Sequence, residues 1–306
     1  MTEFSAWINA ARLRTLPLSV SGVMVGTALA NFYGKSNISI FILALLTAIG
    51  FQITSNFAND YGDGVKGTDN DERIGPKRAL QSGLLSKDGL KRGIIISIII
   101  NFLLIISLVY IAFGLENIEY LLFFMLLGGL SIWAAIKYTI GESAYGYRGL
   151  GDIFVFLFFG LVAVLGAMFL YTKSLNPMAF LPAISVGLLS VGVLNLNNLR
   201  DHQSDRKVNK NTLIVQMGYS KGILYHTALL LIGLICFVVF IVLNFQCWLQ
   251  CIPLLAFAPI LLHLRRVYKI KDPSDLDPEL KKLAISIFLI ALLFYISNNI
   301  FCNFDV

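Results

Sequence analysis

Charged residues are scarce in this chain. Asp, Glu, Lys and Arg make up only 14% of its 306 residues, whereas 57% are hydrophobic and the mean hydropathy is +0.76. A typical soluble domain carries about 25% charged residues. The composition therefore excludes an ordinary soluble fold and is typical of a helical protein that crosses a membrane many times.

Cysteine and histidine are also few. The four cysteines form no CxxC pair and lie in apolar or interfacial sequence, so we expect free thiols instead of disulfides or zinc ligands. The three histidines are scattered along the chain, and we expect none of them to act in catalysis. A metal site in this protein would thus have to rely on oxygen ligands.

Long apolar segments make up most of the sequence. Nine segments of roughly 20 residues are each long enough to cross a bilayer as a helix. A β-barrel would show short alternating strands instead, so the predicted fold is all-α, a polytopic membrane protein with nine transmembrane helices around a central cavity. We treat residues 1–306 as one domain. The predicted spans are 15–33, 38–58, 93–113, 118–137, 152–172, 178–198, 221–243, 248–266 and 282–301.

The basic residues predict the orientation of these spans. With the N-terminus in the cytoplasm, 22 of the 24 Lys and Arg residues fall on the cytoplasmic side, and only Lys35 and Lys173 fall outside. Cytoplasmic loops carry such an excess, so we expect a cytoplasmic N-terminus and an external C-terminus in the inner (cytoplasmic) membrane. Residues 1–13 are expected to lie on the membrane surface. Because the basic residues separate by loop, the net charge of +6 does not indicate nucleic-acid binding.

Two acidic stretches stand where predicted spans end, in the predicted cytoplasmic loops 59–92 and 199–220. Asp60 and Asp63 follow the second span, and Asp201 and Asp205 follow the sixth. Acidic residues at the end of a membrane-length segment are costly, so they are functional candidates by default. Residues four apart share one face of a helix, so each motif should project its oxygens in one direction. The alternative reading is that these are solvated loop charges.

Only hard oxygen ligands are present in the two motifs, which favours Mg²⁺ or a similar ion. Two acidic clusters that face each other would repel unless a cation lay between them. We therefore assign catalysis to the four aspartates and expect the metal to be held by them together with one asparagine from each motif. The predicted metal ligands are Asn56, Asp60, Asp63, Asn197, Asp201 and Asp205.

Cations and tyrosines near the motifs suit a diphosphate substrate. A metal would bridge phosphate oxygens while Lys and Arg take the remaining charge, and a tyrosine ring can stabilise a nearby cation. Positive-inside bias and ordinary aromatic residues at the membrane interface explain the same residues without any substrate. The predicted substrate or diphosphate-binding residues are Lys77, Arg78, Tyr138, Arg148, Lys210 and Arg14.

The segments Asn59-Asp60-Tyr61-Gly62-Asp63 and Asn198-xx-Asp201-xxx-Asp205 resemble the two aspartate-rich motifs of intramembrane aromatic prenyltransferases, the UbiA superfamily. The stretches 11–17, 75–83 and 147–156 are most similar to the branch that uses 1,4-dihydroxy-2-naphthoate. These markers cover residues 11 to 212. The last three helices add only hydropathy to the likeness.

The resemblance implies a Mg²⁺-dependent enzyme of menaquinone biosynthesis, with polyprenyl diphosphate and 1,4-dihydroxy-2-naphthoate as substrates. The prenyl group would be transferred to the naphthoate ring, releasing diphosphate and CO₂ and giving demethylmenaquinone. Two alternatives remain open from the residues. The same site could prenylate another aromatic acceptor, or the chain could be a secondary transporter of a cation or a phosphorylated metabolite.

Overall fold

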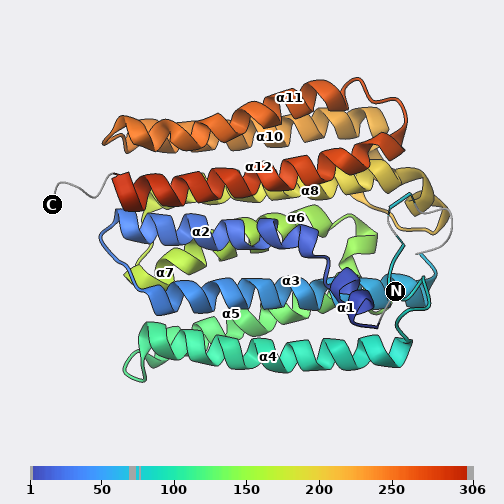
Figure 1. The fold of residues 1–306 in the computed structure, drawn as a ribbon, viewed down its shortest axis with the longest axis horizontal. Helices are drawn as coiled ribbons and strands as arrows, with labels where there is room; N and C mark the ends of the chain where they lie inside the picture. The colour runs from blue at the N-terminus through green and yellow to red at the C-terminus, as the bar shows by residue number, and fades with distance from the viewer. Residues whose placement is uncertain (1–2, 69–73, 76, 302–306) are drawn as a thin grey trace.

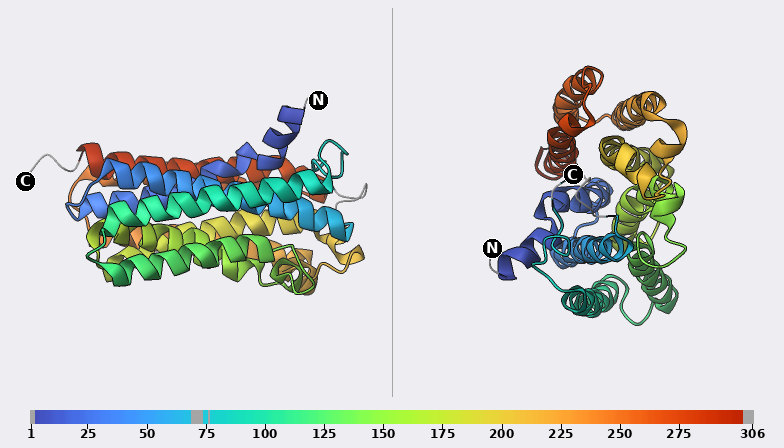
Figure 2. Two further views of the ribbon diagram at one scale, coloured as in Figure 1. Left: turned by 90° about the horizontal axis from the view of Figure 1, so that it is seen from below. Right: turned by 90° about the vertical axis from the view of Figure 1, so that its right-hand side faces the viewer.

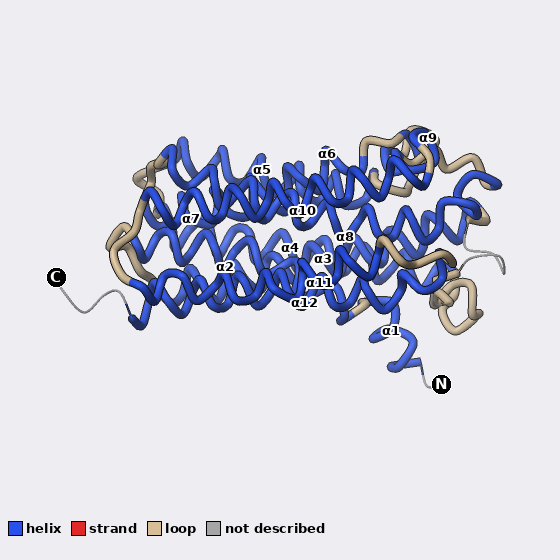
Figure 3. Tube along the Cα trace, turned by 90° about the horizontal axis from the view of Figure 1, so that it is seen from above, coloured by secondary structure: helices blue, strands red, loops and turns tan. Residues whose placement is uncertain are grey.

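The structure is a computed structural model, and it describes residues 3–68, 74–75 and 77–301, with side-chain surroundings up to residue 299. Within these ranges the chain forms helices and loops only, and the loops gather at the two ends of a bundle (Figure 3). In the described part of the chain, nine helical runs are long and apolar enough to cross a membrane. The predicted all-α, nine-span architecture is confirmed.

The helices follow one another along the chain, with the connection between α3 and α4 running from residue 67 to residue 86. Their bounds are α1 Glu3–Ala11, η1 Leu13–Thr15, α2 Leu16–Phe32, α3 Ile38–Lys66, α4 Lys87–Phe113, α5 Ile118–Lys137, η2 Tyr145–Arg148, α6 Gly151–Val155, η3 Phe156–Gly166, α7 Ala167–Thr172, η4 Pro177–Ala179, α8 Phe180–Lys207, α9 Leu213–Met217, α10 Tyr219–Leu243, η5 Trp248–Phe257, α11 Ala258–Val267, η6 Pro273–Leu276, α12 Asp277–Ile296 and η7 Ser297–Phe301.

Successive spans run back and forth along the long axis, so alternate connections meet at the same end (Figure 1). The helix α1, the end of α3 and the end of α8 lie at one end, while the chain finishes at the other. The helix α1 is set at an angle to the bundle (Figure 2) and packs on α3, where Trp7 and Phe57 meet edge to face at 5.3 Å.

Both motif helices continue beyond their apolar segments. The helix α3 runs on to Lys66, and α8 runs on to Lys207. Gly67 ends α3 in the left-handed conformation (φ 72°), which costs glycine little because it has no Cβ. The predicted loops 59–92 and 199–220 therefore begin inside helices, and all four motif aspartates stand on regular helical turns.

The helix α2 is the most buried span. In its apolar window 67% of residues are buried, compared with 28% in α4. Glycines let α2 approach the wide π-type turns of η3: a Cβ on Gly22 would lie 2.5 Å from Ala163 Cβ, and one on Gly26 would collide with the Val164 carbonyl oxygen. Such a small-xxx-small pattern is typical of close helix contacts in membranes.

The outer helices present apolar side chains to the surroundings, as a bilayer requires. The helix α4 carries most of its large hydrophobic residues on the outside. Those exposed on α4 are Ile95, Ile96, Ile99, Ile100, Phe102, Leu103, Ile106, Tyr110 and Ile111.

One cysteine differs from the sequence prediction. Cys236 and Cys251 are free thiols, but Cys247, in the connection between α10 and η5, is disulfide-bonded. The expectation of free thiols is wrong for Cys247. The absence of a CxxC pair does not by itself exclude a disulfide.

We predict that Gly22→Ala lowers thermal stability, because the new methyl group must displace the Phe159 carbonyl oxygen, 2.8 Å away, as well as Ala163. Overpacking of this kind costs about 1–3 kcal/mol. Thermal unfolding in detergent measures the effect. The matched control is Gly129→Ala on α5, where a Cβ meets nothing within 4 Å and stability should be unchanged or slightly higher. Equal melting temperatures for both variants would contradict the close contact.

Candidate active site

Asp60 lies at the edge of the bundle end and is 1% exposed. Its carboxylate accepts hydrogen bonds from the backbone N–H groups of Ala79 (3.1 Å) and Leu80 (3.4 Å). Asp60 therefore anchors the segment that carries Lys77 and Arg78 against α3. Backbone N–H donors stabilise the charged form of a carboxylate without neutralising it.

A cleft of about 550 Å³ opens beside Asp60. Its basic residues come from two segments: Arg12 and Arg14 from the start of the chain, and Lys77 and Arg78 from the connection between α3 and α4. Three of the predicted residues, Arg14, Lys77 and Arg78, are thus brought together with Asp60. The polar and charged lining consists of Ser5, Asn9, Arg12, Arg14, Asp60, Lys77 and Arg78.

Asp63, one turn further along α3, is 6% exposed and accepts a hydrogen bond from the Tyr147 hydroxyl at 2.7 Å. The same hydroxyl lies 2.5 Å from the Thr68 hydroxyl. Lys66 places its ammonium 4.0 Å from the centre of the Tyr147 ring, the geometry of a cation–π contact. Tyr147 therefore links the end of α3 to the η2 turn between α5 and α6.

Asp205 on α8 is 4% exposed, and its carboxylate lies 3.5 Å from the Lys210 ammonium. Asp63 interacts electrostatically with the same ammonium and with Asp205. Lys210 therefore pairs with Asp205 of the second motif, and its ammonium also lies 5.6 Å from the centre of the Tyr147 ring, whose hydroxyl binds Asp63 of the first motif. Burial alone would lower the pKa of Lys210, but Asp63 and Asp205 outweigh it and raise the pKa above its usual value. The Lys210 ammonium therefore stays charged at neutral pH.

The tyrosines of this region are held neutral. Burial raises the pKa of Tyr138 to about 12, with Asp63, Asp152 and Asp205 acting in the same direction and Lys210 opposing them. Burial, followed by Asp63, also raises the pKa of Tyr147. Both hydroxyls thus remain hydrogen-bond donors. The structure places the predicted residue Tyr138 in the electrostatic field of the Asp63–Asp205–Lys210 group.

Asp201, 3% exposed, is paired within its own helix. Arg200 donates to both of its oxygens, from Nε at 2.8 Å and from Nη2 at 2.7 Å. The same Nη2 donates to Asn197 Oδ1 at 2.9 Å. No contact between described residues joins Asp60 to Asp201, so the motifs meet through Asp63 and Asp205 instead.

Two further predicted residues have other surroundings. The Asn56 amide donates to the Ala11 carbonyl oxygen at 2.8 Å and to Thr15 Oγ1 at 3.1 Å, which fixes the start of the chain on α3. Arg148 is exposed on the η2 turn. Asp69, which follows the first motif, lies outside the described residues.

The donor set fits a hard divalent cation. Asp205 Oδ2 is buried and accepts no hydrogen bond within the part of the chain that the structure describes, so one oxygen aimed into this group is unsatisfied. That same part contains no group of three or more acidic, His or Cys side chains able to hold a metal alone. Mg²⁺ commonly binds one or two carboxylates and completes its shell with water and substrate phosphates. The residues present suit such a shared shell.

Sequence reasoning overlooked the roles of Arg200 and Asp277. Arg200 also forms an ion pair with Asp277, the first residue of α12. The only available signal was the position of Arg200 directly before a motif aspartate. Its partner on α12 is 77 residues away and follows only from how the helices pack.

Comparison with known proteins agrees with this picture. Residues 19–300 match the UbiA prenyltransferase family. The chain is 44% identical over 295 residues to the 1,4-dihydroxy-2-naphthoate octaprenyltransferase of Haemophilus influenzae, and the alignment covers 95% of each protein.

Two solved structures share the fold. The apo structure of a UbiA homolog from Aeropyrum pernix has a TM-score of 0.72 at 14% identity and covers 92% of this chain and 97% of that one. A UbiA homolog from Archaeoglobus fulgidus bound to DMAPP and Mg²⁺ has a TM-score of 0.64 at 14% identity and covers 96% of this chain and 99% of that one.

We predict that Lys210→Gln destabilises the metal-free protein, because it leaves Asp63 and Asp205 buried without the nearby ammonium. Removing one partner of a buried ion pair costs about 3–5 kcal/mol. Thermal unfolding in EDTA and in Mg²⁺ measures the loss, and Mg²⁺ should restore more stability to the variant than it adds to the wild type.

The control for this experiment is Lys221→Gln, which removes an exposed lysine at the start of α10. It should melt like the wild type in both buffers. Equal melting temperatures for Lys210→Gln and Lys221→Gln in EDTA would show that Lys210 does not offset the buried carboxylates.

Proposed function

Since this chain belongs to the UbiA prenyltransferase family, we propose that it transfers a polyprenyl group from polyprenyl diphosphate to 1,4-dihydroxy-2-naphthoate. Diphosphate and CO₂ are released, and the product is the reduced (quinol) form of demethylmenaquinone, because ring substitution with loss of CO₂ leaves the two ring hydroxyls in place. One structural observation carries this proposal: the Lys210 ammonium pairs with Asp205 of α8 and lies beside Tyr147, whose hydroxyl binds Asp63 of α3. A buried carboxylate pair with basic residues around it suits a metal-bound diphosphate.

We assign the metal to the carboxylates of the four motif aspartates, Asp60, Asp63, Asp201 and Asp205, with Asp63 and Asp205 as its central ligands. Mg²⁺ held by these residues would supply positive charge that stabilises the leaving diphosphate. The unsatisfied Asp205 Oδ2 supports this assignment. Asn56 and Asn197 already hold Ala11 and Arg200, so their part is to orient the chain around the metal ligands.

We assign the lysine and arginine side chains to binding the negatively charged groups of the substrates. Lys210 is positioned to pair with a phosphate oxygen once a metal satisfies Asp63 and Asp205. Arg14, Lys77 and Arg78 line the cleft beside Asp60 and supply further positive charge. Charge-assisted hydrogen bonds of this kind are the strong ones, and they are strongest where water is excluded.

Exclusion of water is the second requirement of the reaction. Breaking the bond between the allylic carbon and diphosphate leaves a carbon with cationic character, and the electron-rich naphthoate ring must reach it before water does. The four aspartates are each less than 7% exposed. The neutral Tyr138 and Tyr147 lie beside them, and their ring faces suit a nearby positive charge.

We also propose that the end of the bundle with the aspartates faces the cytoplasm and that the chain lies in the inner membrane. The basic residues support this orientation through the positive-inside rule. The disulfide of Cys247 supports it independently, because disulfides persist in oxidising compartments and Cys247 follows α10 at the opposite end of the bundle.

Purified protein incubated with Mg²⁺, octaprenyl diphosphate and 1,4-dihydroxy-2-naphthoate should yield a prenylated, decarboxylated product by mass spectrometry. Octaprenyl diphosphate is the first donor to test because the related H. influenzae protein is named an octaprenyltransferase. Released CO₂ provides a second readout. Parallel incubations with other aromatic acids test for a different acceptor, and the absence of any product with all of them would overturn the proposal.

Arg78→Ala should raise the KM for the prenyl diphosphate about tenfold or more while it changes the KM for the naphthoate much less. The reason is that a hydrogen bond to a charged group contributes about 1.5–3 kcal/mol. Steady-state kinetics with each substrate varied in turn measure the two values. Arg92→Ala is the control, since it removes an exposed arginine from α4. An unchanged diphosphate KM in Arg78→Ala would reject the assignment.

A further inference from the structure

Arg200 is a completely buried arginine at the end of α8. Its side chain is 1% exposed, and all three guanidinium nitrogens have acceptors. Nε and Nη2 bind the two oxygens of Asp201, Nη2 also binds Asn197, and Nη1 pairs with Asp277. A buried guanidinium with this many fixed partners has a single orientation available to it.

Asp277 connects this group to the last membrane span. It is the first residue of α12, and its side chain is 36% exposed, so it is the outermost member of the set. The η6 turn just before it packs against α8. Asp277 thus joins the end of α8 to the beginning of α12.

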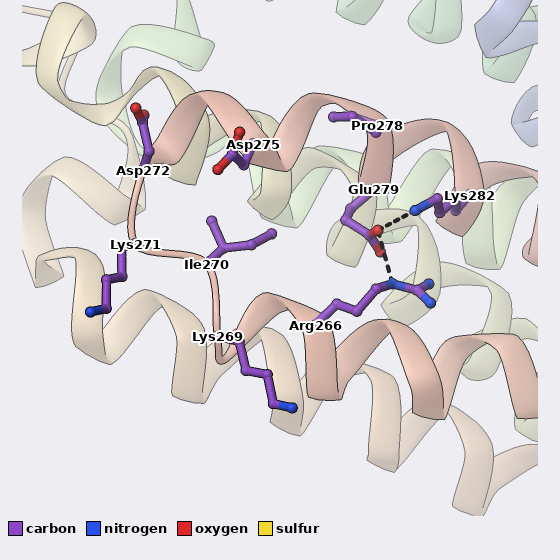
Figure 4. A pocket seen from close by; sticks show the side chains of 9 residues that line it. All are labelled: Arg266, Lys269, Ile270, Lys271, Asp272, Asp275, Pro278, Glu279 and Lys282. Carbon is purple, nitrogen blue, oxygen red and sulfur yellow. Dashed lines mark hydrogen bonds and ion pairs between the residues drawn. The ribbon is translucent and has the colours of Figure 1, made fainter.

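The start of α12 is also held on its other side. Glu279 accepts hydrogen bonds from Arg266 Nε at 2.9 Å and from Lys282 Nζ at 2.6 Å, at the wall of a cleft between α11 and α12 (Figure 4). Glu279 also lies 2.6 Å from His263 Nδ1. Asp277 therefore lies at a helix end that is bonded to α11. These bonds limit how far Asp277 can move relative to Arg200.

We propose that Arg200 is a positioning residue that holds the Asp201 carboxylate in its metal-binding orientation, with Asp277 of the last helix as its anchor. This role rests on the proposed metal–diphosphate site. Each carboxylate oxygen has two lone pairs, and Arg200 uses one on each, so the orientation of the Asp201 carboxylate is fixed. Residues that orient metal ligands typically affect metal affinity or activity by about 10–100-fold when mutated.

The positive charge of Arg200 also reduces the repulsion between the two aspartates of this motif. Asp201 and Asp205 stand four residues apart on one helix face, and their carboxylates repel each other. Lys210 offsets the charge of Asp205, whereas Arg200 offsets that of Asp201. Without Arg200, Asp201 would turn toward water at the bundle end and leave the ligand set. The last helix, which carries no predicted ligand, thereby completes the site.

Asp277→Asn tests this proposal without touching a metal ligand. It removes the charge that anchors Arg200 and keeps the side-chain shape. We expect the Mg²⁺ concentration that gives half-maximal thermal stabilisation, measured with an unreactive prenyl diphosphate analogue present, to rise about tenfold or more. The activation constant for Mg²⁺ in product formation should rise in parallel.

Asp275→Asn is the matched control, because Asp275 is an exposed acid on the same turn and makes no side-chain contact with Arg200 within the described chain. It should leave the Mg²⁺ dependence unchanged. Asp277→Glu, which retains the carboxylate, should recover part of the loss. Equal Mg²⁺ dependence in Asp277→Asn and Asp275→Asn would overturn the positioning role, even if Asp277→Asn melts at a lower temperature in EDTA.

Arg200→Lys provides a second variant that keeps the positive charge but loses the two-pronged contact with Asp201. We expect it to weaken Mg²⁺ binding at least as much as Asp277→Asn, and wild-type Mg²⁺ dependence in this variant would also overturn the proposal. The wild type is assayed alongside. A wild type that binds Mg²⁺ and the analogue but prenylates no aromatic acid would contradict the proposed function and leave the test of Arg200 intact.

Discussion

Negative charge buried at one end of a membrane bundle is the constraint on which the rest of this structure depends. Four carboxylates are withdrawn from water there, and an isolated buried carboxylate is too costly to persist. Each therefore has a different stabilising partner, drawn from a different part of the chain. The pairs are Asp60 with the backbone of Ala79 and Leu80, Asp63 with Tyr147, Asp201 with Arg200, and Asp205 with Lys210.

The arrangement of the helices follows from the need to bring those partners together. Glycine contacts between α2 and η3 draw the interior helices close and leave the apolar faces of helices such as α4 for lipid. Asn56 fixes the start of the chain on α3, which places Arg14 beside Asp60. A site for a charged substrate is thereby built from segments that are distant in sequence, at the end of an otherwise apolar bundle.

Hydropathy alone predicted the nine spans, because the length of a membrane helix is set by bilayer thickness and not by its neighbours. Motif spacing predicted that the aspartates of each motif lie on one helix face, because helical periodicity fixes which face a side chain occupies. Contacts between helices were not predictable in this way. Arg200 pairs with Asp277, and Asn56 binds the Ala11 carbonyl, only because of tertiary packing, for which the local sequence carries no signal.

The central claim is that Asp63 of α3 and Asp205 of α8 hold one metal ion together with the substrate's diphosphate. The most direct measurement is a double-mutant cycle on Mn²⁺ affinity, determined from the electron paramagnetic resonance signal of free Mn²⁺ in the presence of an unreactive prenyl diphosphate analogue. The account predicts that Asp63→Asn and Asp205→Asn each weaken binding and that the double variant loses much less than the sum of the two. Independent, additive losses, or wild-type affinity in either single variant, would contradict it.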